Sequence, residues 1–367
     1  MTTLTLRALN RATLARQLLL RRWALSPLQA IERLAGLQAQ APNPPYLALW
    51  ARLEGFEAAA LTRLLERRRV VRAALLRSTL HLVTSRDYRA WRPLLQPMLV
   101  RALQGGRGRQ LAGLDLDAVV AAGCALLRTQ PHTHGELGRA LAQRWPERDT
   151  DALASVLRNH APLIHRPPAG TWGSTAHATL VHADDWLDAS ASSTAASSGA
   201  TLVQRYLAAF GPASSADITA WSGLTGVRAL IDAQRDRLVV LHDEDGRELF
   251  DLPRAPRPDP DTPAPPRLLG EWDALLLSHA DRRRVMDDTL RARVFTVNGI
   301  VRGTAWLDGV VAGIWKTTTT RDTTTLTIEA FGRWTAAQRA AIVDEAEHLL
   351  AFSAPQARHR VAFGRVG

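Results

Sequence analysis

The sequence contains very little cysteine and almost no lysine. Cys124 is the single cysteine among 367 residues, which excludes an internal disulfide and a zinc site built from several thiolates. Lys316 is the single lysine, so arginine supplies 45 of the 46 basic residues. Any chemistry that needs a side-chain amine, such as a Schiff base, is therefore limited to one position.

Long apolar runs are also missing. No stretch approaches the roughly 20 apolar residues that a membrane-spanning helix needs. The first 22 residues contain no hydrophobic block followed by a cleavage signature. We therefore expect a soluble, cytoplasmic protein with no membrane partner.

The signatures of common cofactor sites are absent as well. The sequence contains neither GxxxxGK[ST] nor a dinucleotide fingerprint. His132 and His134 are the only close pair of histidines, and no third ligand stands at metal-site spacing. We expect no metal and no cofactor. A Ser/His/Asp triad remains open, although no nucleophile elbow is present.

Positive charge is what the chain has in excess. The formal net charge is +11 and the pI is about 11.1, which favours partners that carry phosphates or other anions. A GC-rich genome would produce the same bias toward arginine through codon usage, whatever the function. The charge alone leaves both explanations open.

Two stretches are typical of linkers and divide the chain. Residues 188–200 are rich in Ser and Ala, and residues 253–267 contain repeated prolines that exclude helix and central strand. The length is too great for one typical core. The predicted modules are winged helices at 1–100, 110–187 and 201–252, followed by a C-terminal β domain at 268–367.

The order of helices and hairpins predicts the winged-helix modules. In the second, helices at 115–129, 133–145 and 151–160 precede a strand pair around Ala169-Gly170, and Thr133 with Glu136 forms a capping box. The third repeats this order and ends in a hairpin at 238–252.

The first module fits the same plan less cleanly. We expect helices at 10–23, capped by Asn10 or Thr13, at 26–40 and at 58–69, with strands at 70–78 and 79–84.

The C-terminal part has a different pattern. Asn298-Gly299 and Asp308-Gly309 are strong hairpin turns, and a helix at 335–350 begins with the capping box Thr335 and Gln338. Trp272, Trp306 and Trp315 are predicted core residues. The predicted fold class is α+β, with three tandem winged-helix modules and a C-terminal antiparallel β-barrel or sheet with a terminal helix.

Gln38-Ala39-Gln40 stands at the end of an apolar run, just before Pro42, Pro44 and Pro45. The residue before a proline avoids helical angles. If residues 38–42 are partly extended, the two glutamine side chains project to the same side. Taken alone, the pattern favours an ordinary solvated helix end.

Four blocks in order along the chain resemble the AlkZ/YcaQ-like DNA glycosylases. They are GLQAQAPNPPYLALWARL (36–53), LLRSTLHLV (75–83), LLGEWDALLLSHADRRR (268–284) and VNGIVRGTAWLDGVVAGIW (297–315). In this family a Q-Φ-Q or Q-Φ-D motif, with Φ usually apolar, marks the active site. The resemblance places it on Gln38-Ala39-Gln40, in the Q-Φ-Q form of the AlkZ branch.

The resemblance implies a monomeric, monofunctional glycosylase that hydrolyses the N-glycosidic bond of N7-alkylguanine in double-stranded DNA. The lesions would be bulky or crosslinking adducts of a genotoxic natural product, removed for self-resistance. Gln38 and Gln40 would be catalytic. The residues expected to contact DNA are Arg77, Thr79, His81, Arg282, Arg283, Arg302 and Arg321.

Each of these assignments has a structural alternative. His81 on an apolar strand can be a satisfied core histidine, and Arg282, Arg283 and Arg284 can be a solvated charge run. Asp281 can simply pair with a neighbouring arginine. Arg321 stands at the centre of the polar tip 317–325, which suits either a minor groove or a plain exposed turn.

A non-catalytic regulator built from winged helices is the competing function. Such regulators usually present a recognition helix within a symmetric dimer, whereas here three unlike modules and a β domain share one chain. A protein that sequesters the genotoxin without catalysis is a weaker third possibility.

Overall fold

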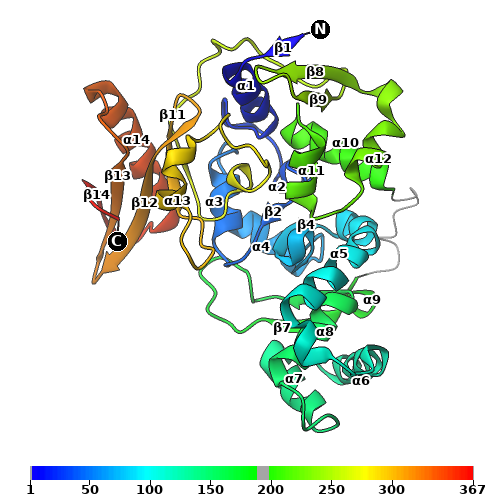
Figure 1. The fold of residues 1–367 in the computed structure, drawn as a ribbon. Coiled ribbons are helices and arrows are strands. Elements are labelled where there is room, and N and C mark those ends of the chain that lie inside the picture. Colours follow the sequence, from blue (N-terminus) through cyan, green and yellow to red (C-terminus); the bar gives the residue numbers. More distant parts are fainter. Residues whose placement is uncertain (1, 188–197, 367) are drawn as a thin grey trace.

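The computed structural model describes residues 2–187 and 198–366. Within them the chain has an α+β fold, as predicted, with helical modules that each carry strands and a separate sheet near the C-terminus (Figure 1). The first module lies in the middle of the molecule, between the C-terminal sheet on one side and the third module on the other. Part of the Ser/Ala-rich stretch predicted as a linker lies outside the described residues.

The first module opens with a short strand and two helices. Thr5 caps the first helix through its side chain, which corrects the expectation that Asn10 or Thr13 does so. Both of those side chains are buried on the helix instead, and Asn10 donates to the backbone oxygens of Arg284 and Gly309. The elements are β1 (Thr3–Leu4), α1 (Leu6–Arg16), α2 (Pro27–Arg33), β2 (Leu37–Gln38), α3 (Pro44–Trp50), α4 (Ala58–Glu66), β3 (Val70–Ala74), a 3-10 turn (Leu76–Ser78) and β4 (Leu80–Thr84).

Helix α2 ends earlier than the predicted range 26–40. Ser26 and Gln29 form a capping box with Pro27 in the first turn, but the helix stops at Arg33. Ala35 and Gly36 then adopt positive φ angles of 55° and 87°, which an α-helix cannot contain. This left-handed turn, rather than the prolines, ends the helix and sends the chain into β2.

Helix α5 (Ser85–Leu111) was not predicted, and it crosses the expected boundary between the first two modules. Thr84 caps its first turn, and Pro93 and Pro97 lie inside it. Interior prolines argue against a helix, but here the helix continues through both.

In the second and third modules three helices precede a strand pair, as predicted, but a two-residue strand also lies between the first two helices of the second module. The capping box of Thr133 and Glu136 is confirmed, and so is the hairpin turn at Gly246, which has φ 77°. The second module contains α6 (Leu116–Thr129), β5 (His132–Thr133), α7 (His134–Ala142), α8 (Thr150–His160), β6 (Leu163–Arg166), β7 (Thr179–His182) and α9 (Ala183–Trp186). The third contains α10 (Gly199–Phe210), α11 (Ser215–Ser222), α12 (Val227–Asp232), a 3-10 turn (Arg235–Arg237), β8 (Val239–Asp243) and β9 (Glu248–Asp251).

The strands of the first two modules form one sheet rather than two separate wings. Its strand order is β2-β4-β3-β6-β7-β5, and β3 meets β6 through the single register pair Arg72 and His165. A strand pair and an aromatic contact are among the links between the third module and the first. β1 pairs in parallel with β8, and Trp91 of α5 packs edge-on against Trp221 of α11, with ring centroids 6.1 Å apart.

The C-terminal sheet is open and mixed, which corrects the expectation of an antiparallel sheet or barrel. Its order is β10-β11-β12-β13-β14, and β13 and β14 run parallel. The strands are β10 (Arg267–Leu269), β11 (Gly303–Leu307), β12 (Val310–Thr320), β13 (Thr323–Ala330) and β14 (Arg358–Phe363). The helices are α13 (Arg291–Val294) and α14 (Ala336–Ser353), with 3-10 turns at Ala274–Leu276 and Asp288–Leu290.

Sequence signals in this region are largely confirmed. Asp308 and Gly309 have φ angles of 46° and 81° and join β11 to β12, as a primed two-residue turn requires. The turn at Asn298-Gly299 closes only an isolated bridge between Phe295 and Val301. Thr335 and Gln338 form the predicted capping box of α14. Trp306 and Trp315 are buried as predicted, while Trp272 is half-buried.

No single helix in residues 2–187 and 198–366 is long and apolar enough to cross a membrane. The helices α5 and α6 pass that test only as a pair, by length and composition, and they meet at an angle of 103°.

Candidate active site

The segment Leu37–Gln40 presents alternate side chains to two environments. Leu37 and Ala39 are buried in the hydrophobic cluster of the first module. Gln38 is paired in register with His81 of β4, and the chain is held further by an Ala39 N–H bond of 2.7 Å to a β4 carbonyl. Because alternate side chains of a strand face opposite sides, Gln38 lies on the other side of β2 from Leu37. Gln40 follows in a bend just beyond the strand and is exposed.

Hydrogen bonds determine how the side-chain amide of each glutamine is oriented, because each amide oxygen faces a donor. Oε1 of Gln38 accepts from Nη2 of Arg77 at 2.8 Å, and Oε1 of Gln40 accepts from the Leu80 N–H at 2.8 Å. Guanidinium and backbone N–H groups can only donate, so the amide oxygens must face them. Each oxygen retains a second lone pair. Gln38 is 8% exposed, whereas Gln40 lies at the surface.

His81 is buried beside Gln38, with 4% of its surface exposed. Its Nδ1 lies 3.0 Å from the Thr79 carbonyl oxygen, so Nδ1 carries the hydrogen and Nε2 does not. Burial, helped by the positive charge of Arg77, lowers the pKa of His81 to about 3. The imidazole is therefore neutral at physiological pH and can accept a hydrogen bond at Nε2.

Arg77 is directed into the protein. It donates to the Trp221 carbonyl of the third module as well as to Gln38. Arg77 and Ser78 have φ angles of 54° and 58°, an uncommon conformation for residues other than glycine. Burial, helped by Arg282, lowers the pKa of Arg77 to about 10. Thr79 is half-buried, and its hydroxyl donates to the Leu76 carbonyl oxygen at 3.0 Å.

The remaining predicted DNA-contacting arginines are dispersed. Arg282 is close enough to Arg77 to affect its pKa. Arg283 forms ion pairs with Asp281 and Asp245, so the alternative that Asp281 pairs with a neighbouring arginine is confirmed.

Arg284, Arg302 and Arg321 differ in burial and in their contacts. Arg284 is buried and donates to the Pro212 carbonyl, which rules out a solvated surface charge for this one residue. Arg302 donates to the Val366 carbonyl at 2.9 Å. Arg321 is exposed at the tip of the turn between β12 and β13, with φ 53°.

One arginine at the site was missed by the sequence reasoning. Arg72 lies in β3 and is 7% exposed. Its Nε donates to the Ala39 carbonyl at 2.8 Å, its Nη2 to the Gln40 carbonyl at 3.2 Å, and its Nη1 lies 3.2 Å from Nδ1 of His165. A charged residue in the middle of the apolar strand VVRAA was the available signal, because such a charge must find buried partners.

A cavity of about 420 Å³ opens next to the glutamine segment. It is bordered by residues 41–44 of the first module, 173–175 of the second and 315–317 of the C-terminal sheet. Its walls include the apolar side chains of Leu47 and Trp315, and burial raises the pKa of Glu271 at its edge. A volume of this size accommodates a bulky organic group.

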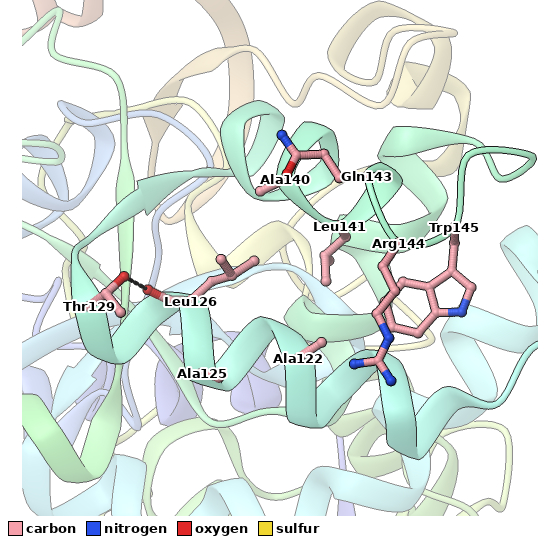
Figure 2. Close-up of a pocket in the computed structure, with 9 residues that line it drawn as sticks. All are labelled: Ala122, Ala125, Leu126, Thr129, Ala140, Leu141, Gln143, Arg144 and Trp145. Atoms are coloured by element: carbon pink, nitrogen blue, oxygen red, sulfur yellow. Dashed lines mark hydrogen bonds between the residues drawn. The ribbon is translucent and has the colours of Figure 1, made fainter.

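A second pocket, of about 560 Å³, lies in the second module, whose helices α6 and α7 are well separated from β2 in the fold (Figure 1). Figure 2 shows the residues that line it. It is formed between α6 and the end of α7, with Leu126 and Leu141 facing each other and Trp145 at one end. Its alanine and leucine lining offers little for catalysis. The described part of the chain contains no group of three His, Cys, Asp or Glu side chains placed to hold a metal ion.

The α+β fold thus holds two glutamine amides close to β4 in a strongly basic protein. The family model named DNA glycosylase AlkZ-like matches residues 31–352, and the chain belongs to this family of DNA glycosylases. The structure is similar to that of Streptomyces sahachiroi DNA glycosylase AlkZ, with a TM-score of 0.81 and 20% sequence identity. The match covers 99% of this chain and 100% of that one. No curated protein matches the sequence.

Proposed function

We propose that this DNA glycosylase hydrolyses the N-glycosidic bond of N7-alkylguanine in double-stranded DNA, with Gln38 and Gln40 as the catalytic pair. The lesions are bulky or crosslinking adducts of a genotoxic natural product, and their removal protects the producing cell. The observation that carries the proposal is the pair of amides two residues apart beside β4, each with its carbonyl oxygen oriented by a definite donor. The neighbouring 420 Å³ cavity is consistent with a bulky substituent.

The weak basicity of an amide suits this reaction. N7-alkylation leaves a positive charge on the guanine, so the base departs without a general acid to protonate it. The enzyme then has to place a water at C1′ and stabilise the developing oxocarbenium. The second lone pair of an amide oxygen can accept a hydrogen bond from that water. Neutral His81, with its free Nε2 lone pair, supplies a further acceptor beside Gln38 without adding positive charge.

The same proposal makes the enzyme monofunctional and monomeric. A lyase step through a Schiff base requires an amine. Lys316 is the only lysine side chain, and because it lines the cavity beside the glutamines, it is the residue at which the monofunctional assignment has to be tested. DNA contacts are assigned to Arg77, Thr79, His81, Arg282, Arg283, Arg302 and Arg321. Among them Arg321 has the exposed position at a turn tip that a groove contact needs, whereas Arg77 acts from within the site.

The test is a strand-cleavage assay. Purified protein is incubated with duplex DNA that carries N7-methylguanine or a bulky N7 adduct, and abasic sites are then cleaved with alkali and resolved on a gel. Gln38→Ala and Gln40→Ala are expected to lose most of the cleavage while retaining DNA binding. Gln143→Ala, which changes an exposed glutamine of the second module, serves as the control. Full activity in both site variants would remove the glutamines from catalysis.

The wider proposal has its own decisive outcome. A winged-helix regulator would bind DNA and leave every alkylated substrate intact. An absence of abasic sites on all N7-alkylated substrates, with DNA binding preserved, would therefore overturn the assigned substrate class.

A further inference from the structure

We propose that Arg72 is a positioning residue that holds the Gln38–Gln40 segment in its reactive conformation and ties it to the second module. The inference rests on the catalytic role proposed for the two glutamines. Arg72 itself does not touch the substrate in this proposal. It acts on the backbone that carries the reacting side chains.

The glutamine segment needs such a support because its strand is very short. β2 contains only Leu37 and Gln38, so the carbonyls of Ala39 and Gln40 lie beyond the regular ladder. Buried backbone oxygens without partners are costly. The guanidinium of Arg72 donates Nε to the first of these carbonyls and Nη2 to the second. Two successive peptide groups are thereby fixed by one rigid, planar side chain.

The second module holds the other end of this guanidinium. Nη1 of Arg72 can only donate, so Nδ1 of His165 must be the acceptor and its ring must be neutral. Burial, with the nearby positive charges of Arg72 and Arg158, keeps it neutral by lowering the pKa of His165 to about 3. In the loop that follows β6, a Cβ added at Gly170 would lie 2.9 Å from Cδ of Arg72, so the backbone there packs directly against the arginine stem.

The arrangement cannot be reproduced by lysine. Arg72 serves three acceptors that are spread around a planar fork, whereas an ammonium group is a single point on a flexible chain. Lysine would keep the positive charge and most of the length but lose at least one carbonyl contact. A displacement of about 1 Å in a reacting group can reduce the rate by about 100-fold.

The experiment compares Arg72→Lys with Arg92→Lys. Arg92 is the matched control, since it is also buried and donates to two backbone carbonyls of the second module, those of Asn159 and Ala161, without contacting the glutamine segment. Single-turnover kinetics on N7-methylguanine DNA are measured with the affinity for DNA and the melting temperature. We expect Arg72→Lys to lower the rate at saturating enzyme by about 10- to 100-fold, with affinity changed by less than about 2-fold.

The control and a double mutant separate positioning from general stability. Arg92→Lys is expected to lower the melting temperature by a similar amount and to keep the rate within about 2-fold of the parent. In a Gln40→Ala background, Arg72→Lys is expected to cost less than about 3-fold more, because both changes disable the same segment. A rate loss that follows the melting temperature in both arginine variants, or full additivity in the double mutant, overturns the inference.

A second variant covers the case in which Arg72→Lys does not fold. Arg72→Ala leaves a space that a guanidinium ion can enter, and millimolar guanidinium is expected to restore part of the rate in this variant and not in Arg92→Ala. The lack of any selective restoration contradicts the proposal. If Gln38→Ala and Gln40→Ala are fully active, the proposed function of the glutamines fails. If they are inactive and Arg72→Lys matches the parent rate, only the role of Arg72 fails.

Discussion

Gly36 controls the turn that carries the chain from α2 into the glutamine segment, and its replacement by alanine is a sharp test of the site. The residue has φ +87°, and a Cβ there would lie 2.6 Å from Cγ1 of Val83 and 3.3 Å from the Leu82 carbonyl oxygen. Both contacts are on β4, the strand that pairs with β2. Gly36→Ala must therefore push β2 away from β4 or distort the turn.

The magnitude follows from two separate costs. A left-handed conformation costs a residue with a Cβ about 1–2 kcal/mol, and overpacking a well-packed site costs about 1–3 kcal/mol more. We expect Gly36→Ala to reduce the free energy of unfolding by about 2–5 kcal/mol. Because Gln38 lies two residues further along, we also expect a loss of at least about 10-fold in the glycosylase rate.

Gly55→Ala is the matched control for this prediction. Gly55 is in the same module and has φ +57°, but no atom lies within 4 Å of its added Cβ. It should show only the backbone cost of about 1–2 kcal/mol and a parental rate. Urea unfolding and single-turnover cleavage of N7-methylguanine DNA measure both variants. Equal rates for the two variants would refute the claim that the turn at Gly36 sets the position of Gln38.

Three further predictions concern protons, salt and covalent trapping. His81 and His165 stay neutral when folded, with pKa values lowered to about 3, whereas the unfolded chain protonates them below 6.5. Above pH 6.5 neither state binds these protons, so the full free energy of unfolding is present. Between pH 6.5 and 3 only the unfolded chain binds them, and the free energy of unfolding falls by up to about 1.4 kcal/mol per pH unit for each histidine. In His165→Asn, unfolding measured from about pH 4 to 7 should show a pH slope smaller by about one proton, and an unchanged slope contradicts the neutral ring. Arg321→Ala should reduce the salt dependence of DNA binding by about one unit of log–log slope, and an unaltered slope would place Arg321 outside the interface. Borohydride should trap no protein–DNA crosslink during turnover, and a crosslink that disappears in Lys316→Arg would show a Schiff base.

Local signals in the sequence predicted individual elements well. The capping boxes at Thr133 and Thr335 and the turn at Asp308-Gly309 depend on residues within four positions of one another, so their pattern is visible without the fold. The end of α2 was predicted too far along the chain, because the prolines at 42, 44 and 45 are a stronger sequence signal for a helix end than Ala35-Gly36. The close approach of Val83, which selects glycine at 36, is a long-range contact.

The features that require distant parts of the chain were not predictable. Helix α5 contains two prolines and a glycine-rich end, and its packing against the third module offsets this poor helix propensity. The parallel pairing of β13 with β14 depends on the intervening helix α14. The joining of two wings into one sheet depends on Arg72 meeting His165, 93 residues later.

In the candidate site, too, the sequence indicated some residues and missed those whose partners are distant in the chain. The sequence, through its family resemblance, predicted Gln38, Gln40 and His81, which lie together. The DNA contact assigned to Arg77 stays a prediction; in the structure its guanidinium donates to Gln38 and to the Trp221 carbonyl. Arg72 was missed because its partners are backbone carbonyls, and backbone carbonyls have no sequence signature.

The two arginines also determine when the site can form during synthesis of the chain. Gln38 and Gln40 leave the ribosome early, but Arg72 obtains its third acceptor only after residue 165, and Arg77 obtains its second only after residue 221. A nascent chain that stops between these points has the glutamines without their full support. On the roles proposed for the glutamines and Arg72, the reactive geometry is complete only late in translation, when more than half of the chain has been made.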